Sequence, residues 1–168
     1  MRSLVIYETM FGNTRAIAEA IGEGLAGGSD VEVTDVADAG PDVPDDVDLL
    51  IVGGPTHTFS MSRAASRREA AGRGGSARDV DRGIREWLEG LSRGEHPQVF
   101  AAFDTRVDFP LLPGAASRSA TKMARRLGFT IAAPESFLVE GYEGPLVEGE
   151  RDRARTWGRT LASGRTVH

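Results

Sequence analysis

The sequence predicts a three-layer α/β sandwich in which helices cover both faces of a five-stranded parallel sheet. Short apolar runs alternate along the chain with segments of helical periodicity, which is the pattern of strands joined by crossover helices. Three of these runs are continuously apolar, as expected for parallel strands buried on both faces. The 168 residues are 40% apolar, which suffices for one core, so we expect residues 1–168 to form a single domain.

The predicted elements follow one another in regular order. Five segments are the predicted strands: residues 3–7, 31–36, 48–54, 99–103 and 129–140, the last interrupted by Pro134. Four segments are the predicted covering helices: residues 14–26, 80–92, 115–127 and 147–162. In the first helix, Ile17, Ile21 and Leu25 recur at i, i+4 and i+8 and form one apolar stripe. A Pro- and Asp-rich link at 37–46 stands where a further helix would otherwise lie.

Residues 60–79 interrupt this alternation. The segment combines arginine, small residues and a glycine cluster, and it is longer than an ordinary connection in a compact domain. We expect a mobile loop rich in arginine and glycine, or a frayed helix over 62–71. If the segment has a function, the composition favours a lid or a partner-docking loop.

The composition excludes several classes of function. The formal net charge of −5 argues against a protein whose main partner is nucleic acid. The chain has no cysteine, so disulfides, thiolate chemistry and sulfur-ligated metals are excluded, and any redox chemistry must come from a cofactor. No His/Asp/Glu cluster has the spacing of a metal site. The first apolar run is too short for a signal peptide and no run approaches a membrane span, so we expect a cytoplasmic protein without a membrane partner.

The turn between the first strand and the first helix is the first candidate site. In an open parallel sheet, ligands bind beyond the carboxyl ends of the strands, and this turn offers unpaired N–H groups to a phosphate. The turn 8–14 has no lysine, as a P-loop would require, and only Gly12 of a dinucleotide fingerprint. It therefore suits the phosphate monoester of a bound cofactor. The structural alternative makes Thr14 a helix N-cap and Asn13 a turn residue.

The same stretch resembles the flavodoxin signature. The matching positions are Val5, Ile6, Tyr7, Thr9, Gly12, Thr14, Ala18 and Ile21. The resemblance covers nearly the whole chain and implies a flavodoxin-like sheet of strand order 2-1-3-4-5 that binds FMN non-covalently. It further implies that Thr9, Asn13 and Thr14 bond the FMN phosphate, while Met10, Phe11 and Gly12 contribute backbone N–H groups.

The turn after the third predicted strand, 54–59, is similar to the G-x-P-T-x-x-F turn of flavodoxin-like NAD(P)H:quinone reductases. That resemblance implies that the turn lines the ribityl chain and one ring edge of FMN, through Pro55, Thr56, His57, Thr58 and Phe59. His57 is then a ring contact or a proton donor, since histidine titrates near neutrality, or else a loop residue without a role. Phe59 covers the dimethylbenzene edge or packs beneath the turn.

The turn after the fourth predicted strand contains Asp104, Thr105 and Arg106. In electron-carrier flavodoxins this turn supplies a tyrosine that stacks on the flavin, and here it contains none. Arg106 or Phe109 would take that face instead, because a guanidinium plane can lie flat on an aromatic ring. An open ring face would admit a substrate. In the acidic segment 139–150, Tyr142 either closes over the site or belongs to a solvated loop.

Three functions agree with these observations. The first is an FMN-dependent enzyme that reduces a quinone-like acceptor with NAD(P)H, favoured by the 54–59 turn and the missing tyrosine. The second is an electron carrier that docks a reductase and an oxidase in turn, favoured by the short length and acidic charge. The third is a flavin-free signalling or scaffolding protein with the same fold. No catalytic side chain and no oligomeric state can be assigned from the sequence.

Overall fold

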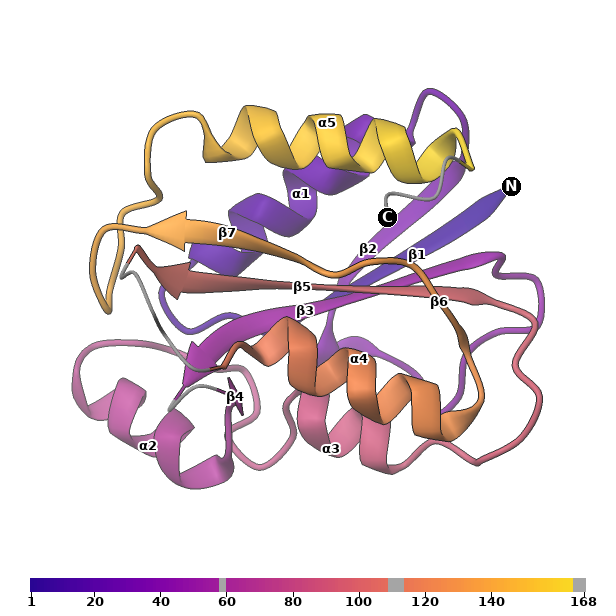
Figure 1. Ribbon diagram of the computed structural model, residues 1–168. Coiled ribbons are helices and arrows are strands. Elements are labelled where there is room, and N and C mark those ends of the chain that lie inside the picture. The colour runs from indigo at the N-terminus through magenta and orange to yellow at the C-terminus, as the bar shows by residue number, and fades with distance from the viewer. Residues whose placement is uncertain (58–59, 109–113, 165–168) are drawn as a thin grey trace.

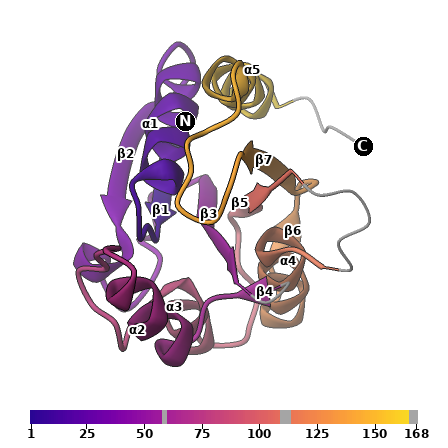
Figure 2. The same ribbon diagram turned by 90° about the vertical axis from the view of Figure 1, so that its left-hand side faces the viewer.

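The computed structural model describes residues 1–57, 60–108 and 114–164 and shows one sheet between two layers of helices (Figures 1 and 2). The strands are β1 (Arg2–Tyr7), β2 (Asp30–Asp35), β3 (Leu49–His57), β4 (Ser60–Met61), β5 (Val99–Val107), β6 (Thr130–Ile131) and β7 (Glu135–Val139). The helices are α1 (Asn13–Leu25), the 3₁₀ turn η1 (Val36–Asp38), α2 (Ala64–Gly72), α3 (Ile84–Glu89), α4 (Ala116–Leu127) and α5 (Glu150–Ala162). None of the described helices is long and apolar enough to cross a membrane.

The sheet confirms the predicted topology. Its order is β2-β1-β3-β5-β6. Strand β7 pairs with the same edge of β5 as β6 does, further along that strand. These strands are parallel, and β6 with β7 takes the place of the fifth predicted strand. The short β4 is an addition, which pairs antiparallel with the end of β3.

Helices cover both faces, and each face has its own apolar core. Figure 1 shows α1 and α5 on one side of the sheet and α3 and α4 on the other. One cluster of buried side chains joins the sheet to α1 and α5, and a second joins it to α3 and α4. Helices α1 and α5 touch through glycines: a Cβ on Gly24 would lie 2.0 Å from the carbonyl oxygen of Arg155. A Cβ on Gly158 would lie 2.4 Å from that of Ile21, so neither position has room for a side chain.

Three predicted boundaries were wrong. Strands β3 and β5 run on to His57 and Val107, because Gly54 pairs with Asp104 and Pro55 with Thr105. The interruption expected at Pro134 within 129–140 is confirmed, since β6 and β7 are separated by the residues around Pro134, whose nitrogen has no hydrogen to donate to a ladder. The helix expected at 80–92 covers only 84–89.

Residues 60–79 contain β4 and α2, and α2 lies close to the helix allowed over 62–71. Its Arg67 is fully buried, although the segment reads as exposed and basic. Arg67 Nη1 donates to the carbonyl oxygen of Val80 at 2.9 Å. Val80 lies before the N-cap of α3, which is Gly83, and Gly90 ends the helix. Whether α2 moves as a lid stays a prediction.

Arg67 is the centre of a buried polar network that joins β1, β4, α2 and α3. Its Nε lies 2.9 Å from the hydroxyl of Ser62 and 3.6 Å from a carboxylate oxygen of Glu8, and its Nη2 bonds Glu86. Ser62 also donates to Glu8, and the backbone N–H of Ile84 donates to the other Glu8 oxygen at 3.0 Å. Burial raises the pKa of Glu8, while Ser62 and Arg67 oppose that rise. The network therefore depends on the Arg67 charge.

We expect Arg67→Met to lower the free energy of unfolding by about 3–5 kcal/mol, because it leaves the buried Glu8 carboxylate without its cation. Urea denaturation measures this loss. Arg68→Met is the matched control, since Arg68 is the exposed neighbour on α2 and pairs with Asp81 at the surface. Equal stabilities of the two variants would contradict the importance of the network.

Candidate flavin site

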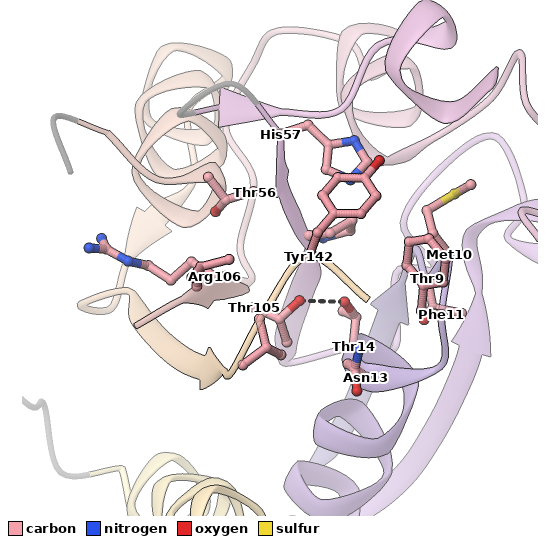
Figure 3. A pocket seen from close by; sticks show the side chains of 13 residues that line it. Thr9, Met10, Phe11, Asn13, Thr14, Thr56, His57, Thr105, Arg106 and Tyr142 are labelled. Atoms are coloured by element: carbon pink, nitrogen blue, oxygen red, sulfur yellow. Dashed lines mark hydrogen bonds between the residues drawn. The ribbon is translucent and has the colours of Figure 1, made fainter. Parts of the chain in front are cut away.

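A pocket lies at the carboxyl ends of β1, β3 and β5, where the three candidate turns meet (Figure 3). It is lined by Thr9, Met10, Phe11, Asn13, Thr14, Pro55, Thr56, His57, Thr105, Arg106, Val107, Val139 and Tyr142. The structure thus brings together ten of the residues that the sequence assigned to the site. Gly12 and Asp104 do not line the pocket, and Thr58, Phe59 and Phe109 lie outside the described residues.

The β1–α1 turn leaves the start of α1 open towards the pocket. Gly12 takes a left-handed conformation (φ 88°), which favours glycine, and its N–H donates to Thr9 Oγ1 at 3.0 Å. Helix α1 begins at Asn13 without a side-chain cap and without an acidic residue in its first turn. Its first N–H groups therefore remain for an anion.

Thr14 is not the N-cap that the structural alternative required, because Gly12 holds that position. The Thr14 hydroxyl lies 2.8 Å from that of Thr105, a contact that ties α1 to β5 (Figure 3). Asn13 Nδ2 donates to the carbonyl oxygen of Glu143 at 3.1 Å, which fixes the loop after β7 against the turn.

Tyr142 brings a tyrosine ring to the pocket from a loop other than the turn after β5. It belongs to the loop between β7 and α5, which crosses the ends of the strands in Figure 2. Its ring stacks on His57 with centroids 6.1 Å apart and planes at 23°, and meets Phe11 edge-on at 5.5 Å. The guanidinium of Arg73 lies 4.6 Å from its ring centre. Tyr142 thus covers the pocket, as one of the two sequence-based alternatives proposed.

The flavodoxin family model matches residues 5–157 of the chain. The chain belongs to the flavodoxin family. Its cofactor is accordingly FMN, which overturns the alternative of a flavin-free scaffold. The uncapped start of α1 and the hydroxyls beside it fit the phosphate of that cofactor. No curated protein sequence matches the chain.

Solved flavodoxins share this fold over their whole length. An archaeal flavodoxin is 20% identical, with 98% of each chain covered and a TM-score of 0.66. The flavodoxin of Streptococcus pneumoniae TIGR4 is 16% identical, with 98% of this chain and 99% of that chain covered and a TM-score of 0.68. Two-electron reduced Megasphaera elsdenii flavodoxin is 20% identical, with coverage of 96% and 98% and a TM-score of 0.61.

His57 of this flavodoxin is tied to α2. Its Nδ1 lies 3.1 Å from the hydroxyl of Ser66, and that hydroxyl donates its single proton to the carbonyl oxygen of Arg63 at 2.9 Å. Burial, and then the charge of Arg67, lower the pKa of His57. His57 is therefore mostly uncharged at neutral pH.

The extended β5 explains where the residues after the fourth predicted strand lie. Side chains alternate along a strand, and Thr105 faces α1 while the Asp104 carboxylate accepts from the backbone N–H of Ser117 at 2.8 Å. Asp104 therefore holds the start of α4, and burial raises its pKa. The guanidinium of Arg106 points away from Tyr142 in Figure 3, so a contact of Arg106 with the flavin ring stays a prediction.

Val107, Val139 and Tyr142 line the pocket without having been assigned to it. Val107 and Val139 are the last residues of β5 and β7. A sequence-based prediction that extended these strands would have placed both residues at the pocket. For Tyr142 the signal was its position after the last strand, in a chain with only two tyrosines.

We expect NMR titration of the His57 ring to give a pKa below its ordinary value of 6.5. The unfolded chain takes up this proton near pH 6.5 and the folded chain only at lower pH, so His57 makes stability fall as pH decreases from about 7 to 5. His57→Gln should reduce that decrease in urea denaturation. A His57 midpoint at or above 6.5 would be contrary to this expectation.

Proposed function

We propose that this flavodoxin uses FMN to reduce a small quinone-like acceptor with electrons from NAD(P)H. The observation that carries the proposal is His57, which lies in the quinone-reductase-like turn and lines the pocket as an uncharged base. Reduction of a quinone consumes two electrons and two protons, whereas a carrier of single electrons needs no proton-exchanging side chain. NAD(P)H supplies the two electrons and one proton as hydride, and solvent supplies the second proton.

The residues of the β1–α1 turn would hold the FMN phosphate. Thr9, Asn13 and Thr14 offer polar side chains, and the uncapped start of α1 offers N–H groups and the positive end of the helix dipole. When bound, FMN supplies the redox chemistry, which no side chain of a cysteine-free chain provides.

The aromatic side chains would hold the flavin ring. His57 and Tyr142 present nearly parallel faces, with Phe11 at the edge of Tyr142. Tyr142 would cover one side of the bound ring, and the guanidinium of Arg73 contacts its outer face. Around the flavin, His57 would exchange a proton with the substrate.

A second candidate function is an electron carrier that serves a redox partner protein. The observation that favours it is the full-length likeness to single-domain flavodoxins, with 98% of this chain and 98% of the archaeal protein covered.

Anaerobic mixing of the FMN-loaded protein with NADPH and a naphthoquinone decides between the two functions. We expect repeated turnover of NADPH, measured by its absorbance, and a lower turnover number in His57→Gln when both proteins are saturated with FMN. If NADPH leaves the flavin oxidised and only a partner reductase reduces it, the carrier function replaces the enzymatic one.

We expect Thr14→Val to weaken FMN binding about 10- to 100-fold, because the lost hydrogen bond has a charged acceptor. Flavin fluorescence measures the affinity. Riboflavin serves as the control ligand, since it lacks the phosphate and should bind the parent and the variant equally. A similar loss for both ligands would show that Thr14 does not bind the phosphate.

A further inference from the structure

A second cavity lies beside the flavin pocket, between β4 and the start of α2. It has a volume of about 460 Å³, which is within the range of small-molecule sites. Its walls are His57, Ser60, Met61, Arg63, Ala65, Ser66 and Glu69. His57 lines both this cavity, here named the α2–β4 cavity, and the flavin pocket. A molecule bound in it therefore reaches the same histidine that the flavin site uses.

The charges around the α2–β4 cavity favour an anion. The structure pairs Arg73 with Glu69 at 3.2 Å and Arg68 with Asp81 at 3.0 Å, and within the described ranges it pairs Arg63 with no carboxylate. The acid on the cavity wall is thus already neutralised, and an exposed guanidinium remains. Because the whole chain carries −5, this excess of positive charge is local.

A second cation, Arg85, lies close to the residues of the same wall. Arg85 reaches Ser60 Oγ with Nη2 at 3.1 Å and the carbonyl oxygen of Met61 at 2.7 Å. Burial, and then the charge of Arg63, lower the pKa of Arg85. An anion between them would relieve that repulsion. Ser60 and Ser66 add hydroxyls, and Met61 and Ala65 add an apolar surface.

We propose that the α2–β4 cavity binds the anionic group, a phosphate or a carboxylate, of the small redox substrate that exchanges electrons with FMN. Arg63 is the residue that recognises it. The inference rests on the proposed function for the identity of the substrate, but the anion site itself does not depend on turnover.

The first experiment measures binding directly. FMN-loaded protein, whose phosphate turn is already filled, is titrated with sodium pyrophosphate while NMR follows the ring of His57. We expect a saturable shift in the parent, about 10-fold weaker binding or more in Arg63→Gln, and a change below about twofold in Arg68→Gln. Arg68 is the matched control because it lies on the same helix outside the cavity. No saturable shift in the parent, or equal weakening in both variants, overturns the proposal.

The second experiment identifies the source of the anion through KM. A KM for NADPH that rises about 10-fold in Arg63→Gln at unchanged kcat assigns the cavity to the donor. A KM that rises for a carboxylated naphthoquinone, but not for the neutral one, assigns it to the acceptor. Unchanged values for all three overturn the substrate assignment. A complete lack of turnover in the parent refutes the proposed function, and the pyrophosphate titration still decides on the anion site.

Discussion

The buried guanidinium of Arg67 holds together the part of the molecule that shapes the flavin pocket. It joins the end of β1, through Glu8, to β4, α2 and α3. Helix α2 in turn carries Ser66, which orients His57, and it precedes Arg73, which contacts Tyr142. One buried charge thus determines the position of two of the rings that surround the site, although it touches neither.

Such a centre is costly, because a charge in the interior loses its hydration and must be fully hydrogen-bonded. Arg67 meets this demand with two carboxylates, a hydroxyl and two carbonyl oxygens. Gly83 is part of the same arrangement, since a Cβ there would lie 2.1 Å from Glu8 and 2.3 Å from Arg67. The close packing leaves no room for water to replace a missing partner.

Apolar periodicity is a local signal and predicted the parallel sheet with its covering helices. The resemblance of the phosphate turn to the flavodoxin signature implied the strand order and the meeting of the three turns. The sequence did not predict the ends of β3 and β5, since Pro55, Thr56 and His57 have the composition of a turn and form strand only by pairing with β5 and β4. Burial of Arg67 was equally hidden, because arginine-rich composition indicates solvent exposure. Tyr142 was recognised as an alternative but not chosen, since the path of the β7–α5 loop depends on long-range contacts such as that of Glu143 with Asn13.

The glycine contact between α1 and α5 connects the cofactor to the far end of the chain. Helix α1 begins at the phosphate turn, and near its end Gly24 lies directly against the backbone of α5. A ligand that binds only the folded state stabilises every element that must be folded with its site. Loading with FMN would therefore slow amide hydrogen exchange in α5. Removal of the C-terminal helix would in turn weaken FMN binding.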